Sequence, residues 1–175
     1  MLSNVGDVIE WTPAALAVFA SSADAGTAKV GCSVRAEPAP PVAVSPTDAV
    51  LGPLALVGGR AWVRKEPDAF NRQGYKIPAT LLDGERATLR GPSSMRGRVG
   101  LVFTRAAQDR VFERGVRGAD RAVTFTACPA GDEPSRSAWA GGLVVDRPRC
   151  ATLTLHREGR PSIRRRLPLG RPCPR

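Results

Sequence analysis

Three of the four cysteines lie at the ends of stretches in which apolar and polar residues alternate. Cys128 follows residues 122–127, Cys150 precedes residues 151–155, and Cys173 follows residues 163–169, whereas Cys32 lies far upstream. Alternation with a period of two is typical of a β-strand with one buried face. An even number of cysteines at strand ends predicts disulfides, and therefore a β-domain that folds outside the reducing cytosol.

Glycine and proline are frequent enough to leave little room for long helices. The chain has 18 Gly and 16 Pro among 175 residues, and its aromatic content is only 5%. This composition favours short strands joined by turns. A chain of this length can bury a substantial core in one domain, so disulfides would reinforce the fold and are not required for it.

Strand-like stretches recur at regular spacing from residue 51 onward. The expected strands are residues 54–57, 60–63, 75–81, 86–90, 98–103, 122–128, 139–145, 150–156 and 161–167. Gly58-Gly59 is expected to turn a hairpin, Pro78 to confine its strand to a sheet edge, and Gly141-Gly142 to mark a bulge or a close backbone approach. Eight or nine short strands predict an all-β fold, a two-sheet antiparallel sandwich of the Ig-like kind.

At most one short helix is expected. Residues 106–114 place Ala107 and Val111 four positions apart, with Thr104 as N-cap and Gly115 as the stop. A long polar loop is the alternative for this stretch. In the expected strands that follow, alternation predicts four buried side chains: Val123, Phe125, Leu153 and Leu155.

The chain is expected to divide into a tail and a folded domain. Residues 37–46 are rich in proline, lack apolar periodicity, and predict an extended spacer. Strand signals begin only after this spacer. We therefore expect residues 1–45 to form an N-terminal tail and residues 46–175 to form the disulfide-linked β-sandwich domain.

The tail contains a segment that resembles the second half of a secretory signal. A seven-residue apolar run at 14–20 is followed by Ala23-Asp24-Ala25, but Asp7 and Glu10 stand where a signal has Lys or Arg. A plain tail is the alternative interpretation. The run is too short to span a membrane. Because the cysteines independently favour an oxidising compartment, we expect an extracellular or cell-envelope location.

The cysteine spacing favours disulfides over a zinc site or free thiols. Cys128 and Cys150 are separated by 21 residues, and Cys150 and Cys173 by 22, so the short C-x2-4-C hooks of zinc sites are missing from this region. If the last four strands form an up-and-down meander, Cys150 and Cys173 share one end of it, which favours Cys150–Cys173 and leaves Cys128 for Cys32. A Greek-key crossing would instead favour Cys128–Cys150 with Cys32–Cys173.

Several of these stretches also carry recognisable motifs. They are Val-Thr-Phe-Thr-Ala-Cys at 123–128, Trp-Ala-Gly-Gly-Leu-Val-Val at 139–145, Pro-Arg-Cys at 148–150 and Leu-Pro-Leu-Gly at 167–170. Together they resemble uncharacterised small predicted-secreted proteins of high-GC Gram-positive bacteria, over residues 50–173. The resemblance implies an exported β-sandwich, and it implies neither an activity nor any functional residue.

The chain is strongly basic. Its formal net charge is +10, with 23 Arg and 3 Lys, and such a surface attracts polyanions. The C-terminal stretch supplies the expected polyanion-binding residues: Arg157, Arg160, Arg164, Arg166 and Arg171. Charge that protects an edge strand from pairing with other chains is the alternative. Arg165 would share a face with Ile163 and Leu167, so we expect it to reach out at an edge or the strand to bulge there.

Catalytic and cofactor motifs are sparse. His156 is the one histidine, and a serine-hydrolase triad would need it together with an acid such as Asp120 or Asp146. The chain has no G-x-S-x-G elbow, nucleotide-binding glycine motif or EF-hand loop. We therefore expect no metal and no cofactor.

The sequence thus predicts a non-catalytic exported or cell-envelope module without a transmembrane segment. Its expected partner is an anionic polymer or an envelope protein. The alternative is a basic domain that binds wall polymer, anionic lipid or nucleic acid, and a hydrolase that uses His156 is the third hypothesis.

Overall fold

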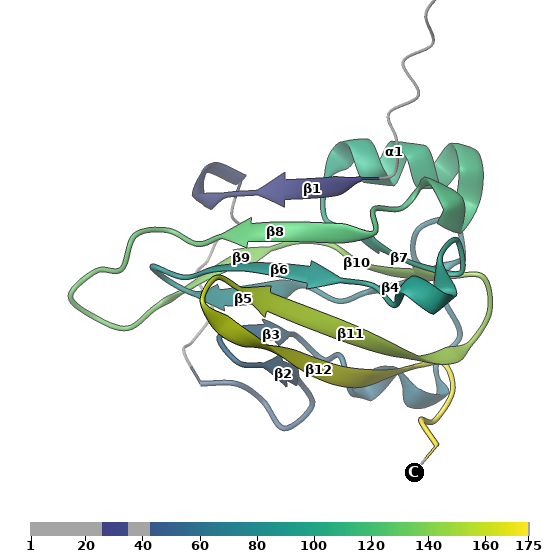
Figure 1. The fold of residues 1–175 in the computed structure, drawn as a ribbon. Coiled ribbons are helices and arrows are strands. Elements are labelled where there is room, and N and C mark those ends of the chain that lie inside the picture. The colour runs from purple at the N-terminus through teal and green to yellow at the C-terminus, as the bar shows by residue number, and fades with distance from the viewer. Residues whose placement is uncertain (1–25, 35–42, 175) are drawn as a thin grey trace, which may run out of the picture.

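The computed structural model describes residues 26–34 and 43–174, which form twelve strands in three sheets and one α-helix (Figure 1). The five-stranded sheet has the order β1 (Thr27–Val30), β8 (Ala122–Thr126), β6 (Arg86–Arg90), β11 (Arg149–Arg157) and β12 (Arg160–Leu169). The four-stranded sheet has the order β2 (Ala49–Leu51), β3 (Leu54–Leu56), β5 (Ala79–Leu82) and β9 (Arg136–Trp139). The three-stranded sheet has the order β4 (Gly74–Lys76), β10 (Gly142–Val145) and β7 (Val99–Val102). The expectation of a β-rich fold with one short helix is confirmed, with three sheets where two were predicted.

The two smaller sheets share one register. Lys76 of β4 pairs with Gly142 of β10, and Ala79 of β5 pairs with Trp139 of β9. The segment 74–82 is therefore aligned with the segment 136–144 in the same antiparallel register before and after Ile77-Pro78. The Ile77 N–H donates to the Gly141 carbonyl at 2.9 Å. Pro78 has no N–H to donate, which interrupts the ladder at this point.

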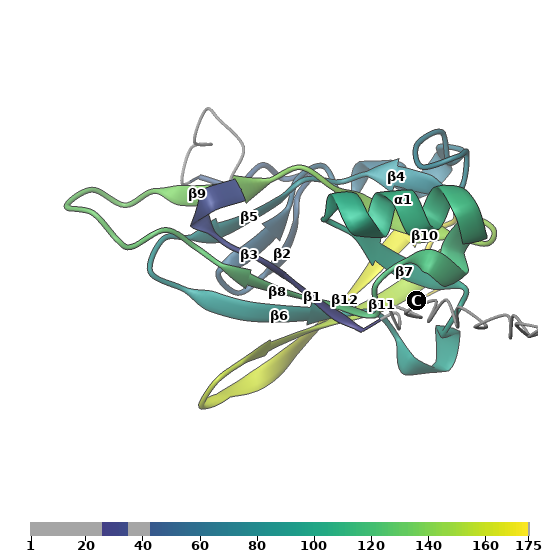
Figure 2. The same cartoon turned by 90° about the horizontal axis from the view of Figure 1, so that it is seen from above.

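The core lies between the five-stranded sheet on one side and the two smaller sheets on the other (Figure 2). Phe125 contributes from β8, and its ring centroid lies 5.1 Å from that of Phe103 and 5.2 Å from that of Trp139. The four side chains predicted to be buried are confirmed as buried: Val123, Phe125, Leu153 and Leu155.

The helix α1 (Arg105–Arg114) begins and ends where the sequence indicates. The Thr104 hydroxyl accepts a hydrogen bond from the Ala107 N–H at 3.1 Å, and Gly115 ends the helix with φ of 61°, which a residue without Cβ adopts readily. The buried side of α1 covers a second apolar cluster: Val102, Ala107, Val111, Ala119 and Val144.

The predicted hairpin at Gly58-Gly59 is wrong. The hairpin consists of β2 and β3 and turns at Gly52-Pro53, where Gly52 has φ of 59°. The Asp48 side chain accepts from the Gly58 N–H at 2.8 Å, and residues Ala61–Arg64 continue as a 3-10 helix (η2) rather than a strand. This helix places Trp62 against Tyr75, with ring centroids 5.4 Å apart.

Two expected strands are split. The edge position expected for the strand 75–81 holds only for its first half, since β4 is an edge strand of the three-stranded sheet whereas β5 lies between β3 and β9. Ile77-Pro78 separates β4 from β5, and Ala140-Gly141 separates β9 from β10. The close approach predicted at Gly141-Gly142 is confirmed, since a Cβ on Gly142 would overlap the Tyr75 carbonyl oxygen.

The expected meander of the last four strands is also wrong. β8 and β11 lie on either side of β6, while β9 and β10 belong to the other sheets. The disulfides are nevertheless Cys150–Cys173 and Cys32–Cys128, the pairing that the sequence favoured. β8 and β11 run in the same direction because both are antiparallel to β6, so Cys128 and Cys150 lie at opposite ends of the sheet.

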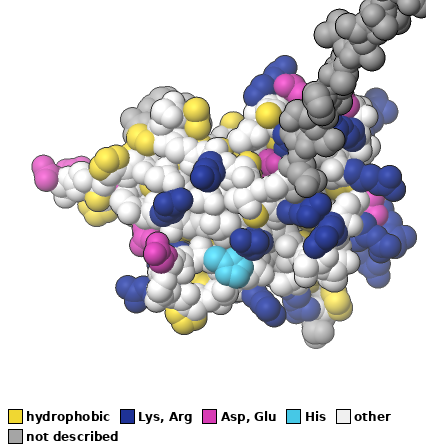
Figure 3. Space-filling view, turned by 45° about the horizontal axis from the view of Figure 1, so that its top comes forward, with side chains coloured by type: hydrophobic (Ala, Val, Ile, Leu, Met, Phe, Trp, Pro, Cys, Tyr) yellow, Lys and Arg dark blue, Asp and Glu magenta, His cyan; other side chains and the backbone are white. Residues whose placement is uncertain are grey.

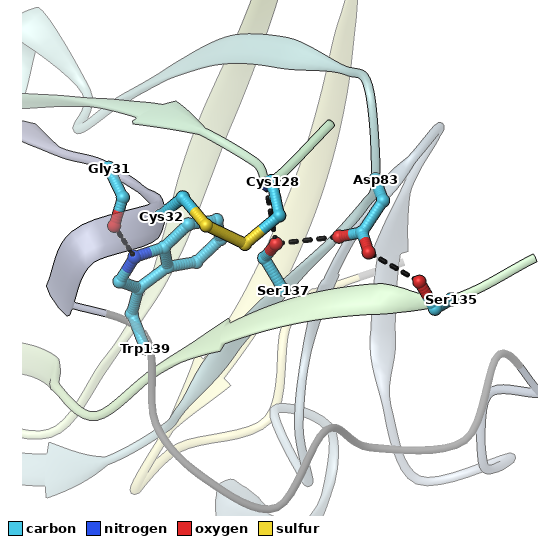
Figure 4. Close-up of a disulfide and its surroundings, with 7 residues drawn as sticks. All are labelled: Gly31, Cys32, Asp83, Cys128, Ser135, Ser137 and Trp139. Atoms are coloured by element: carbon cyan, nitrogen blue, oxygen red, sulfur yellow. Dashed lines mark hydrogen bonds between the residues drawn. A yellow bond between two sulfur atoms is a disulfide. The ribbon is translucent and has the colours of Figure 1, made fainter. Parts of the chain in front are cut away.

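The segment that leads to Cys32 is tied to the rest of the fold by the Cys32–Cys128 disulfide and by a hydrogen bond from Trp139 to Gly31 (Figure 4). β1 pairs in parallel with β8, and the Trp139 indole N–H donates to the Gly31 carbonyl at 3.0 Å. The Cys128 N–H donates to the Ser137 hydroxyl at 2.8 Å, and that hydroxyl donates to Asp83 at 2.6 Å. β1 therefore lies within the range 1–45 that was expected to be a tail.

The signal-like residues 14–25 and residues 37–42 of the spacer lie outside the described residues. Within the described ranges, no helix is both long and apolar enough to cross a membrane.

Candidate polyanion-binding surface

The outer face of the five-stranded sheet, meaning its side chains that point away from the core, follows from strand alternation and register. Arg164 on β12 pairs with Thr154 on β11, which pairs with Arg90 on β6. In the next row, Thr88 on β6 pairs with Thr124 on β8, and their hydroxyls are hydrogen-bonded at 2.9 Å. Basic and hydroxyl side chains therefore stand side by side across several strands.

The outer face is basic and contains no acid at the register positions of its described strands. Its basic members are Lys29, Arg86, Arg90, Arg164 and Arg166, all of them exposed. Its hydroxyl members are Thr27, Thr88, Thr124, Thr126, Thr152, Thr154 and Ser162. Figure 3 shows this side of the molecule, with Lys and Arg side chains in dark blue around the one histidine in cyan. The positions of the outer face carry no Phe, Tyr or Trp side chain, and His156 is their one aromatic ring.

The basic side chains of the outer face have no ion-pair partner among the described residues. Glu158 lies in the turn between β11 and β12, beyond the outer face, and two other acids near the sheet ends are paired with arginines outside that face. Glu85 pairs with Arg157 at 3.6 Å, and Asp146 pairs with Arg149. The positive charge of the outer face is thus available to a ligand from solution.

Three arginines line a pocket of about 160 Å³ at one end of β6. Arg90 ends β6, Arg96 follows the short 3-10 helix η3 (Ser93–Met95), and Arg121 precedes β8. The Gly91 N–H donates to the Arg121 carbonyl at 3.0 Å, which holds the two chain segments together. None of the three guanidinium groups has a hydrogen bond or an ion pair within the described part of the chain. We refer to this place as the three-arginine pocket.

A second hollow lies beside the Cys150–Cys173 disulfide, with a volume of about 780 Å³. Arg147, Arg166 and Arg171 are among its lining residues. The Arg166 guanidinium donates to the Pro174 carbonyl, so the disulfide-bonded C-terminal segment is held against the edge strand β12. This hollow extends the basic surface around the end of the sheet.

The five residues predicted to bind polyanions lie in different surroundings. Arg164 and Arg166 are on the outer face, Arg171 lines the second hollow, and Arg160 is exposed at the start of β12. Arg157 is half-buried and pairs with Glu85, so it does not join the outer face. Arg165, which the sequence placed at an edge, donates from its Nε to the Val50 carbonyl of β2 at 3.1 Å.

Several basic residues of this surface were missed by the sequence reasoning. Arg86 and Arg90 could have been found, because they flank Thr88 in a strand whose other positions, Ala87 and Leu89, are apolar. Arg96 and Arg121 join Arg90 only through contacts between distant segments, for which the sequence carries no local signal.

The structure does not assemble a triad around His156. Its Nδ1 lies 2.8 Å from the Ser162 hydroxyl on the exposed outer face. Asp146 is bound to Arg149, and Asp120 is buried against Arg110 under α1, so neither acid reaches His156. Within the described ranges, no three His, Cys, Asp or Glu side chains are grouped as a metal site would require.

One buried ion pair lies apart from the outer face. Arg110 on α1 contacts Asp120 at 2.5 Å, and its Nε donates to the Gly118 carbonyl at 3.0 Å. Burial raises the pKa of Asp120, while its interaction with Arg110 acts in the opposite direction. The Oδ2 atom of Asp120 is buried without a hydrogen-bond partner.

Comparisons with known proteins give no assignment, since no family model, curated protein or solved structure matches the chain.

Proposed function

We propose that this protein is an exported, disulfide-linked β-module that binds a phosphate-rich polymer through the outer face of its five-stranded sheet. The observation that carries the proposal is the set of five exposed basic side chains on that face, without an acidic partner among the described residues. Neighbouring rows of a sheet lie about 7 Å apart along a strand, and alternate strands lie about 10 Å apart. An extended chain of phosphates can contact several of these cations at once.

The chemistry of the outer face favours a polymer of sugar or polyol phosphates over nucleic acid. Proteins that bind single-stranded nucleic acid stack its bases on aromatic side chains. The positions of the outer face carry threonine and serine hydroxyls instead, and these donate to and accept from the hydroxyls of a sugar or polyol. The three-arginine pocket would receive one phosphate group at the end of the row.

The disulfides support export, and the shared register supports the two-layer fold. Both disulfides belong to an oxidising compartment, since the cytosol keeps thiols reduced. The common register of the two smaller sheets supports our proposal that they act as one bent layer, packed on the five-stranded sheet as in an Ig-like sandwich.

The test is the salt dependence of binding to poly(glycerol phosphate), measured by fluorescence anisotropy from about 50 to 200 mM salt. Five contacts predict a slope of log K against log salt of about −3.5, at about 0.7 per contact. The triple variant Arg90→Gln, Arg164→Gln, Arg166→Gln should reduce that slope by about 2. The matched control removes three exposed charges elsewhere that also have no ion pair among the described residues, with Arg64→Gln, Arg72→Gln and Arg117→Gln.

Two results would contradict the proposal. Equal losses in the two triple variants would mean that net charge alone attracts the polymer. No binding at the lowest salt would remove the function altogether. A single-stranded DNA of equal phosphate count that binds as tightly as poly(glycerol phosphate) would overturn the preference for a polymer without bases.

A further inference from the structure

Asp120 is a buried carboxylate with only half of its hydrogen-bonding capacity used. The residue is 3% exposed, and its Oδ1 contacts Arg110 while its Oδ2 has no hydrogen-bond partner. Native structures leave few buried polar atoms unsatisfied, so each such atom calls for an explanation. A second hydrogen-bond donor, preferably a cation, would complete the site.

A pocket of about 310 Å³ lies beside this carboxylate. Asp120, Arg110 and Thr104 line one side, and Gly26–Lys29 at the start of β1 line the other. The Gly26 carbonyl accepts a hydrogen bond at 3.3 Å from the N–H of Arg121, the residue that follows Asp120. Gly26 and Asp120 therefore line the same pocket, and the start of β1 lies on the Asp120 side of the sheet.

The sequence before Gly26 has the pattern of a cleavage site. Ala25 and Ala23 are small residues at the first and third positions before Gly26, and the apolar run at 14–20 precedes them. An export-linked endopeptidase recognises such a pair of small residues after an apolar segment. Cleavage at that point would leave β1 intact, since β1 begins at Thr27.

We propose that the Ala25–Gly26 bond is a processing site and that the α-ammonium group released at Gly26 binds Asp120 in this pocket. The reaction is a hydrolysis catalysed by an endopeptidase of the signal-peptidase class. Water adds to the Ala25 carbonyl carbon, the C–N bond breaks, Ala25 leaves with a carboxylate, and Gly26 keeps the amine. That amine takes up a proton, because an α-amino group has a pKa of about 7.7–8.0.

The released group matches the site in charge and size. Burial of Asp120 disfavours its charged form more than Arg110 favours it, so a second cation stabilises the carboxylate. Gly26 has no side chain to obstruct the approach of its own amine. β1 would then be held at both ends, by the Gly26–Asp120 contact at its start and by Cys32–Cys128 beyond its end.

The first experiment tests the processing site. The full chain is incubated with a purified bacterial signal peptidase, and the products are identified by intact-mass spectrometry. We expect one cleavage, with Gly26 as the new first residue, and no cleavage of the Ala25→Phe control. An uncleaved wild-type chain, or a cut at another bond, overturns the proposal.

The second experiment tests the contact in the cleaved protein by thermal unfolding. Cleavage should raise Tm by about 2–4 °C, the shift expected for one favourable buried contact in a domain of this size. Selective acetylation of the α-amino group should remove the rise, and the uncleaved chain treated in the same way controls for its three lysines.

Asp120→Asn should also remove the rise, and if that variant does not fold, the acetylation result decides alone. Equal Tm values before and after cleavage, or a rise that survives acetylation, would overturn the contact. The processing step rests on the proposed export. None of these readouts depends on polyanion binding, so this proposal and the proposed polymer binding can fail separately.

Discussion

The two faces of the five-stranded sheet are built from the same strands and have opposite roles. On β11, Leu153 and Leu155 point inward and are at most 1% exposed, whereas Thr154 and His156 between and beyond them point outward. A slip of one residue in register would exchange the two faces, so the apolar face fixes where the basic face lies. Burial of the inner face therefore determines the geometry of the proposed binding surface.

Arginines show the same contrast in a single residue type. Arg136 is 6% exposed, donates to the Pro53 carbonyl at 2.9 Å, and has a pKa that burial lowers. Arg164 on the outer face is solvated and needs no protein partner. A buried cation must be satisfied within the fold, whereas an exposed one stays free to bind a ligand.

The largest expected effect separates the two faces at adjacent positions. Leu153→Ala should lower the free energy of unfolding by about 2–5 kcal/mol, because it removes a fully buried side chain and leaves a cavity. Thr154→Ala should change it by no more than about 0.5 kcal/mol. Urea denaturation of both variants measures the difference. A destabilisation by Thr154→Ala as large as that by Leu153→Ala would show that the outer face is also a packing surface.

The next effect follows from the one tyrosine, which lies on the buried side of β4. Burial, together with Glu66 and Asp68, raises the pKa of Tyr75 to about 12. The side chain is fully buried, and its hydroxyl donates to the Lys65 carbonyl at 3.1 Å. The folded pKa lies above the unfolded value of about 10. The contribution of the neutral Tyr75 hydroxyl to the free energy of unfolding is therefore fully present below pH 10 and is lost as the pH rises toward 12.

The size of that loss is about 3 kcal/mol, from a shift of about two pKa units. Absorbance at 295 nm reports the titration without interference, since the chain has a single Tyr. We expect a midpoint near 12 in the native protein and near 10 in denaturant. Tyr75→Phe should lack this part of the alkaline stability loss. A native midpoint near 10 would mean that the Tyr75 hydroxyl is solvated.

The fold was predictable where local pattern and tertiary contacts agree. β8 and β11 alternate in agreement with their buried faces, and α1 has both a cap and a stop. The hairpin at Gly52-Pro53 was missed because Gly58-Gly59 carries an equally strong local turn signal, although Ala61–Arg64 after it form a 3-10 helix and not a second strand. β1 was missed because four residues that pair in parallel with a distant strand have little local pattern.

The disulfide pairing was favoured correctly from a wrong topology. Cys150 and Cys173 flank the ends of a hairpin that turns at Glu158-Gly159, and such local geometry does not depend on the order of the other strands. The candidate surface was predictable to a smaller extent. Alternation locates Arg164 and Arg166, but the three-arginine pocket requires segments from β6, η3 and the start of β8 to meet, which no local pattern encodes.

The smallest expected effect distinguishes two neighbouring exposed arginines of β12. Arg165 points toward the four-stranded sheet and donates to the Val50 carbonyl of β2, so Arg165→Gln should cost about 0.5–1 kcal/mol of stability. Arg164 points outward beside Thr154, so Arg164→Gln should leave stability unchanged and reduce the salt slope of polymer binding by about 0.7. The two variants have the same net charge and lie one position apart, which makes each the control for the other. Equal losses of binding in the two variants would mean that the polymer contacts the edge of β12 and not only the outer face. The difference in role between the two faces would then not apply to β12.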